Sequence, residues 1–272
     1  MKLLSTLTLL ITCSFAANGF AENNSEKPPE AVHAAMLATP VTSSVFDASQ
    51  KIAIEKIVHD YLLAHPEILM EVGQALELKQ QASVQAKAAK VIPALLKELL
   101  NDSASPSAGN PKGAVSIVEF FDYQCPHCKV MAKEIDGVLA SDHNVRVIYK
   151  ELPIFGADSE FAAKAALASQ RQGKFLVFHN ALLNAQGRLS NQTVLDIAKS
   201  VGLDLNTLQA NMNLPEYNTE LKNSALLANK LGITGTPGFV VVSVKKDGKV
   251  KSVFIPGQTN KEQLLQAVHT VQ

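Results

Sequence analysis

The spacing of apolar positions changes along this chain, and each spacing predicts a different kind of element. Between residues 47 and 78 the apolar side chains recur at helical intervals, and Pro66 divides them into two helices, since proline suits a first helical turn. Asp47, followed three positions later by Gln50, has the spacing of a capping box and predicts where the first helix begins. Residues 79–90 are mostly alanine, glutamine, lysine and serine, which predicts a solvent-exposed helical stalk.

The amphipathic helices of this first part are too short to enclose a hydrophobic core of their own. We therefore expect residues 47–100 to form a helical oligomerisation domain with its stalk, whose apolar stripe packs against another copy of the chain. The alternative is that these helices fold back onto the rest of the molecule. Residues 101–113 contain two prolines and several serines and glycines, which is typical of a linker.

From residue 114 onward the pattern predicts a mixed α/β domain. An apolar, β-branched and aromatic run at 114–121 predicts a buried central strand, and further strands are expected at 145–150, 239–244 and 249–255, the last two as a hairpin. Helices are predicted at 129–139, 159–172, 175–183, 193–201, 205–212, 216–231 and 261–271.

The first 21 residues have the pattern of an export signal. A lysine precedes an uncharged apolar run at residues 3–17, and small side chains stand at the −3 and −1 positions of a cleavage site after Ala21. A membrane anchor is the alternative, although the run is shorter than the roughly 20 residues that span a bilayer. A lipoprotein signal ending at Cys13 fits less well, because the residue before it is not small. Residues 22–46 are polar, proline-containing and aperiodic, which predicts a flexible arm.

Composition excludes two classes of function. The chain has 272 residues, with 25 lysines and arginines against 25 aspartates and glutamates, so its formal charge is zero. Such a chain has no electrostatic footprint for a nucleic acid. Its 3 cysteines are too few for a scaffold built on disulfides, so any cysteine chemistry must be local.

That local chemistry is the sequence Cys125-Pro126-His127-Cys128, between a predicted strand and a predicted helix. This order places Cys125 at a helix N-terminus, where free backbone N–H groups and the helix dipole favour a thiolate. Cys128, one turn later, can attack a mixed disulfide formed at Cys125 and release the partner. His127 can stabilise the thiolate by a hydrogen bond or a charge, or it is an exposed polar residue without a role.

The size of the effect indicates what such a site does. If the pKa of Cys125 falls from about 8.5 to about 4, the reduced form is stabilised by about 4 kcal/mol at pH 7 relative to the disulfide. The disulfide then becomes more oxidising by about 90 mV. Half a zinc site is the competing interpretation, but it needs two more ligands, and the histidines are scattered along the chain. A purely structural disulfide would close too short a loop to stabilise much.

Glu119 lies six residues before Cys125, inside the apolar run. Burial of its carboxylate would raise its pKa and make it a candidate proton shuttle for Cys128 during resolution of the mixed disulfide. The alternative is an ordinary charge at the margin of a sheet.

Two separated segments resemble one protein family. Residues 118–128 resemble the active-site segment of the DsbA-like thioredoxin-fold oxidoreductases, including the Cys-Pro-His-Cys of their strongly oxidising members. Residues 232–240 resemble the cis-proline loop of the same family. The N-terminal helical unit, with Asn-Pro-Lys-Gly at 110–113, further resembles the oligomeric ScsC-type branch. The resemblance implies a thioredoxin-like α/β fold over residues 114–272 with a helical insertion at about 157–231.

The resemblance also implies roles for the second segment. Pro237 would be cis and would lie beside Cys125, leaving the Thr236 backbone free to pair with an extended substrate segment. In this family the residue before the proline tunes redox behaviour, and Thr236 resembles the isomerase-type members, whereas monomeric oxidases commonly carry valine. Both disulfide isomerase and oxidase activity are therefore expected.

The expected setting is the periplasm. The implied partners are exported proteins with cysteines, membrane redox proteins of the DsbB or DsbD type, and one or two further copies of the chain; no metal and no cofactor is expected. The rival function is an oligomeric chaperone or copper-stress binding protein whose cysteines hold a metal or take no part in redox turnover.

Overall fold

The computed structural model describes residues 45–272, so the expected export signal and nearly all of the expected arm lie outside the described residues. The chain divides into two compact units, the first ending at Tyr61 and the second beginning at Leu62. Helix α1 spans Ala48–Ala64 and begins at the expected capping box. The Asp47 carboxylate accepts the Gln50 N–H at 2.8 Å, and the Gln50 carboxamide accepts the Asp47 N–H at 2.9 Å.

Helix α2 spans Glu67–Val91, with Pro66 at its N-cap position. Its first half is exposed, but from Val84 onward it packs on the sheet: Ala88 is buried, and the Gln85 carboxamide accepts the Phe254 N–H at 3.0 Å and donates to the Phe254 carbonyl. The prediction of a solvated stalk over residues 79–90 is therefore wrong for its second half. The sequence pattern did not reveal this contact, because beside Val84 it is made by Gln85, which is polar, and Ala88, which is small.

The segment after α2 belongs to the core of the second unit. The 3-10 helix η1 (Ile92–Leu95) and helix α3 (Leu96–Leu100) bury Ile92, Leu95 and Leu99 against one face of the sheet. The expectation that all of residues 47–100 form a separate oligomerisation domain is thus wrong for its last part. The expected linker at 101–113 contains a short edge strand, β1 (Ser107–Gly109).

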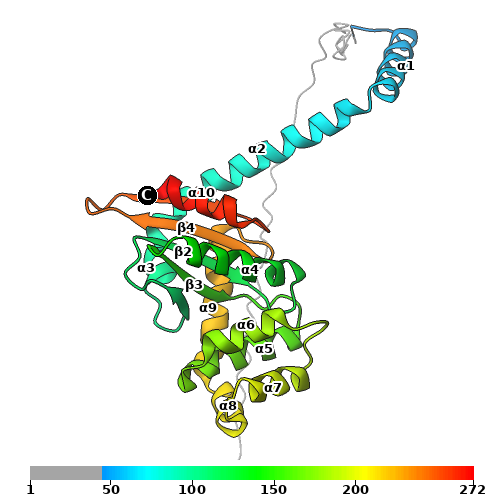
Figure 1. The fold of residues 1–272 in the computed structure, drawn as a ribbon. Helices are drawn as coiled ribbons and strands as arrows, with labels where there is room; N and C mark the ends of the chain where they lie inside the picture. Colours follow the sequence, from blue (N-terminus) through cyan, green and yellow to red (C-terminus); the bar gives the residue numbers. More distant parts are fainter. Residues whose placement is uncertain (1–44) are drawn as a thin grey trace, which may run out of the picture. The chain divides into compact units, whose positions relative to one another are not determined.

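A five-stranded mixed sheet in the order β1-β3-β2-β4-β5 organises the second unit (Figure 1). The central strand β2 (Val115–Phe121) is buried at every position, as its continuous apolar run predicts. It pairs in parallel with β3 (Val145–Glu151) and antiparallel with β4 (Gly238–Val244), which continues into β5 (Val250–Ile255). Strand β1 pairs antiparallel with β3. The expected α/β thioredoxin-like fold is confirmed.

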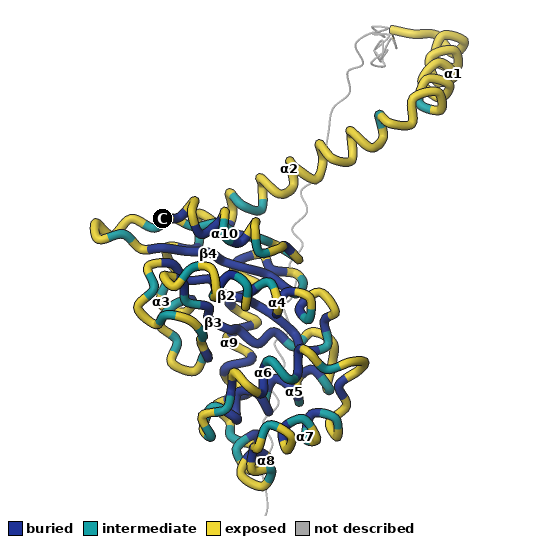
Figure 2. The backbone as a smooth tube through the Cα atoms, in the orientation of Figure 1, coloured by how far each residue is buried: buried dark blue, intermediate teal, exposed yellow. Residues whose placement is uncertain are grey.

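Helices cover both faces of this sheet, and Figure 2 shows the buried positions gathered in the strands and in the helix faces that meet them. In one core, helix α4 (Pro126–Ser141), helix α10 (Lys261–Val271) and buried residues from helices of the 157–231 segment pack together on one face of the sheet. The other core joins η1 and α3 to the end of helix α9 (Pro215–Leu231) on the opposite face. The 157–231 segment consists of α5 (Ala157–Ser169), η2 (Gln170–Gln172), α6 (Phe175–Asn184), α7 (Asn191–Ser200), α8 (Leu205–Met212) and α9 (Pro215–Leu231). Within residues 45–272 no helix has the length and apolar character needed to cross a bilayer.

Candidate functional site

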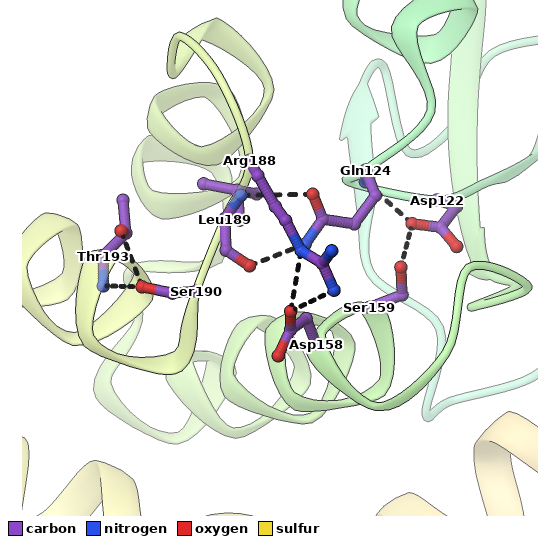
Figure 3. Close-up of polar contacts among 8 residues, drawn as sticks. All are labelled: Asp122, Gln124, Asp158, Ser159, Arg188, Leu189, Ser190 and Thr193. Carbon is purple, nitrogen blue, oxygen red and sulfur yellow. Dashed lines mark hydrogen bonds and ion pairs between the residues drawn. The ribbon is translucent and has the colours of Figure 1, made fainter.

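The reactive-cysteine motif lies where the central strand β2 gives way to helix α4. Cys125 is the N-cap of α4 and has an extended backbone conformation, and Pro126 is the first helical residue. Asp122 fixes the preceding turn: its buried carboxylate accepts the Gln124 N–H at 2.8 Å and the Ser159 hydroxyl at 2.7 Å (Figure 3). The strand, the turn and the helix therefore fix the backbone on which Cys125 sits.

The two cysteines are buried free thiols with opposite acidities. A hydrogen bond from the Cys128 thiol stabilises the Cys125 thiolate and is the largest cause of its lowered pKa, which is about 5. The backbone N–H groups of Cys128 and His127 lower the pKa of Cys125 further, although burial opposes the shift. Burial raises the pKa of Cys128 far above its usual value, and the neighbouring Cys125 and Glu119 raise it further. Cys125 is thus suited to be the attacking thiolate, and Cys128 stays protonated until it is needed.

The expected cis-proline loop lies against the reactive cysteine. The Thr236–Pro237 peptide bond is cis, and the Cys125 thiol donates to the Thr236 carbonyl oxygen at 3.2 Å. Pro237 is followed directly by β4, which pairs with β2. The structure thus brings Thr236, 111 positions further along the chain, into contact with Cys125, which also forms a hydrogen bond with Cys128.

His127 is exposed, and its Nδ1 forms a hydrogen bond with the side-chain oxygen of Gln258. Gln258 lies between β5 and α10, and sequence reasoning missed it. The sequence offered no signal for this contact, because a glutamine in a loop 131 positions from its partner has no local pattern.

Glu119 lies inside β2 and is 1% exposed, which rules out an ordinary charge at the sheet margin. Its register partners are Tyr149 on β3 and Phe239 on β4. Burial, with a smaller contribution from Cys125, raises the pKa of Glu119 to about 8. A carboxyl with this acidity can hold or release a proton near neutral pH.

Glu151 is a further buried carboxyl, which sequence reasoning missed. It ends β3, and burial raises the pKa of Glu151 well above its usual range, while the Tyr123 hydroxyl opposes that shift. The Tyr123 hydroxyl oxygen lies 2.9 Å from His179 Nδ1, within hydrogen-bond distance. Burial lowers the pKa of His179 to about 3, so this imidazole is neutral. Strand alternation could have found Glu151, since it shares the inner face with Tyr149.

Within residues 45–272 no group of three or more histidine, cysteine, aspartate or glutamate side chains is arranged to hold a metal ion. The groups described around Cys125 are the second thiol and the backbone groups that form hydrogen bonds with it.

Two family models match the chain. The DSBA-like thioredoxin domain matches residues 116–269, which is more than half of the chain, and the copper resistance protein ScsC N-terminal domain matches residues 50–83.

Solved structures show the same similarity. A thioredoxin-like oxidoreductase from Silicibacter pomeroyi DSS-3 is 44% identical, covering 64% of this chain and 95% of that one, with a TM-score of 0.59. BcfH from Salmonella enterica Typhimurium is 31% identical, covering 82% of this chain and 96% of that one, with a TM-score of 0.63. The second match includes much of the N-terminal region as well as the thioredoxin domain.

Curated sequences give a mixed picture. The match to the Na(+)/H(+) antiporter NhaA 1 of Salinispora arenicola is 28% identical over 135 residues and spans only 21% of that protein. The thiol:disulfide interchange protein DsbA of Burkholderia cepacia is 26% identical over 178 residues, covering 63% of this chain and 84% of that one. The Cys-Pro-His-Cys motif at the start of α4, the cis-proline loop and these matches agree with one another. The chain belongs to the DsbA-like thioredoxin-domain family of thiol–disulfide oxidoreductases, and its thioredoxin domain follows an N-terminal region of the ScsC type.

Proposed function

We propose that this protein exchanges disulfides with exported proteins through Cys125 and Cys128. One observation carries the proposal: the two cysteines at the start of α4 differ in acidity. The pKa of Cys125 is lowered to about 5, whereas burial raises the pKa of Cys128 far above its ordinary value. A pair of thiols with this difference suits sequential attack, because one is a thiolate and good leaving group at neutral pH and the other is held in reserve.

The exchange proceeds in two balanced steps. The Cys125 thiolate attacks one sulfur of a substrate disulfide, forms a mixed disulfide and expels the second substrate sulfur as a thiolate. Cys128 then loses its proton, attacks the Cys125 sulfur and releases the first substrate sulfur, leaving a Cys125–Cys128 disulfide. Run backwards, the same steps oxidise a substrate dithiol.

The neighbouring residues serve these two steps. The ionised form of Glu119 accepts the proton of Cys128 during resolution, and its raised pKa lets it return that proton near neutral pH. The backbone of Thr236, in contact with Cys125, pairs with the extended substrate segment, and Pro237 belongs to the same loop. Pro126 starts the helix, and the backbone N–H of His127 stabilises the thiolate.

The proposal extends to an oligomer of two or three chains with both isomerase and oxidase activity. Large apolar side chains stay exposed along α1 and the first half of α2, among them Ile52, Ile57, Leu69, Val72 and Leu76. Such faces are stabilised when copies of the chain bury them against one another. Several thiolates held around a shared substrate favour the repair of wrongly paired disulfides.

The export signal expected at residues 1–21 supports a periplasmic setting, which is oxidising enough for disulfide exchange. There the site is reset by membrane redox proteins of the DsbB or DsbD type. Thiol trapping in cells distinguishes isomerase from oxidase activity of this protein. Cysteines found mostly as free thiols indicate an isomerase, and cysteines found mostly as a disulfide indicate an oxidase.

Two assays test the proposed function. Reduction of insulin and refolding of a scrambled multi-disulfide protein are compared for the wild type, Cys125→Ser and Cys128→Ser. We expect Cys125→Ser to lose both activities and Cys128→Ser to accumulate mixed disulfides with substrate. Scrambled-protein repair that survives in Cys125→Ser would contradict the redox mechanism.

A second candidate function is that of an oligomeric copper-binding protein or chaperone. The match of residues 50–83 to the N-terminal domain of a copper resistance protein supports it. Metal analysis after copper loading and gel filtration tests it on the same sample. Copper retained by Cys125→Ser as well as by the wild type would favour this candidate over a redox enzyme.

A further inference from the structure

A groove of about 540 Å³ opens beside the reactive-cysteine motif, and neither Thr236 nor Pro237 takes part in it. Its lining residues are Gln124, Pro126, Lys129, Phe155, Gly187 and Arg188. Two of them, Pro126 and Lys129, belong to the first turns of α4, so the groove begins at the catalytic helix itself. The others come from the turn before Cys125, from the loop after β3 and from the loop between α6 and α7.

Hydrogen bonds fix the loop between α6 and α7 to the catalytic turn. The Gln124 carboxamide donates to the Leu189 carbonyl at 2.6 Å and accepts the Leu189 N–H at 3.1 Å (Figure 3). The Lys129 ammonium donates to the carbonyls of Ala185 and Gly187, at 2.8 and 3.1 Å. This wall of the groove is therefore organised before any substrate arrives.

Phe155 adds an aromatic ring to the lining of the groove. Phe155 is 52% exposed, yet its N–H donates to the buried Asp122 carboxylate at 3.1 Å, the same carboxylate that fixes the catalytic turn. An exposed ring held in this way offers contact area at little cost in conformational entropy.

The charges on the groove favour an anionic group. Arg188 donates to a single Asp158 oxygen through Nε at 3.0 Å and Nη2 at 2.7 Å, and its side chain remains 77% exposed (Figure 3). The Lys129 ammonium, by contrast, is bonded to two neutral carbonyl oxygens and forms no ion pair with a carboxylate within residues 45–272. An acidic side chain in the groove would therefore meet this ammonium and one exposed guanidinium.

We propose that this groove is a second substrate-binding site, which receives the extended segment next to the reacting cysteine of a substrate protein. An apolar side chain of that segment packs on Phe155 and Pro126, and an acidic side chain lies beside Lys129 and Arg188. The inference rests on the proposed disulfide exchange and names its preferred substrates: disulfides with an acidic residue close to the cysteine.

Peptide disulfides test the proposal directly. A peptide series carries glutamate, glutamine or lysine at each of the two positions on either side of a single disulfide-linked cysteine. The rate constant for reaction with the full-length reduced protein is measured by acid quenching, with bis(2-hydroxyethyl) disulfide as a small neutral reference. At one or more positions we expect the glutamate peptide to react about three- to fivefold faster than the lysine peptide, which is the size of an exposed charge effect.

Two groove variants and two matched controls complete the experiment. Arg188→Glu should remove the preference for glutamate, and Phe155→Ala should slow all peptides severalfold, while neither changes the reaction with the small disulfide. The controls are Arg171→Glu, which also removes an exposed arginine paired with a carboxylate, here Glu216 at 2.9 Å, and Leu226→Ala, whose side chain is 53% exposed. Both controls lie outside the groove and should keep the wild-type preference.

The outcomes separate the two proposals. A wild type that reacts with the small disulfide but shows no preference at any position overturns the groove, as does a preference that persists in Arg188→Glu. A wild type that fails to react with the small disulfide overturns the proposed exchange and the groove with it.

Discussion

Two thiols three residues apart bind their protons with opposite strength, and this contrast is the basis of the proposed chemistry. Cys125 accepts a hydrogen bond from the Cys128 thiol and others from N–H groups at the N-terminus of α4, whereas Cys128 lies one turn deeper, where burial disfavours an anion. Glu119 lies on the strand that leads to both thiols, and its raised pKa makes it a stronger proton acceptor than an ordinary carboxylate.

Glu119 should leave a signature in the stability of the reduced protein. Its pKa is about 8 in the folded state and 4.5 when unperturbed, so burial of its carboxylate opposes folding more strongly as the pH rises from about 4.5 through about 8. We predict that Glu119→Gln is increasingly stabilising relative to the wild type across that range, measured by urea unfolding. Glu77→Gln, on the exposed part of α2, is the control. A difference that does not change with pH would contradict the assignment.

Several site residues could be predicted from the sequence, because motifs with fixed local spacing identify Cys125, Cys128 and Glu119. Gln258 and the Gln124–Leu189 contact could not be predicted, since they join loops that meet only after the chain has folded. Such contacts depend on tertiary packing, and no period or propensity encodes them.

Among the elements, the end of α2 shows where sequence patterns fail. Val84, Ala88 and Ile92 recur every fourth residue and form a continuous contact with the sheet, but alanine indicates helix propensity as readily as burial. Strand β1 was missed for a similar reason, because three small residues between prolines resemble a linker. The strands and helices with strong apolar periods, from β2 to α10, were predicted within a few residues of their observed bounds.

A single charge tests whether α2 packs on the sheet. Ala88 is buried, so Ala88→Glu places an unpaired carboxylate in the interface and should lower the free energy of unfolding by about 2 kcal/mol or more. The neighbouring Ala89 is exposed, and Ala89→Glu should change the free energy of unfolding by less than about 0.5 kcal/mol. Urea unfolding of both variants supplies the comparison, and equal effects would mean that this contact does not stabilise the fold.

For the whole molecule, we expect the boundary between the proposed oligomerisation region and the thioredoxin-domain core to fall within α2. Residues 50–83 match the ScsC N-terminal domain, and Val84 is where contact with the sheet begins. Ile92, Leu95 and Leu99 pack against the face of the sheet that carries Val118 and Phe120. The catalytic unit therefore needs these residues to cover that face.

Two truncations test this boundary. A chain that begins at residue 79 should be a folded monomer that still reduces insulin, because it keeps the core segment and loses the exposed apolar helices. A chain that begins at residue 101 should unfold or aggregate, because it exposes the sheet face that Ile92, Leu95 and Leu99 cover. Sedimentation and thermal unfolding of both chains, beside the full-length protein, measure the outcome. Equal stability of the two truncations would place the boundary at residue 100 instead.

The most direct test of the mechanism is a pH titration of the Cys125 thiolate by its absorbance near 240 nm, in the reduced protein and in Cys125→Ser as the blank. We predict a single midpoint at about pH 5 that moves upward in Cys128→Ala, because the Cys128 thiol is the largest cause of the lowered pKa. A wild-type midpoint close to 9.0, the value of an unperturbed thiol, would contradict the proposed role of this helix start in disulfide exchange.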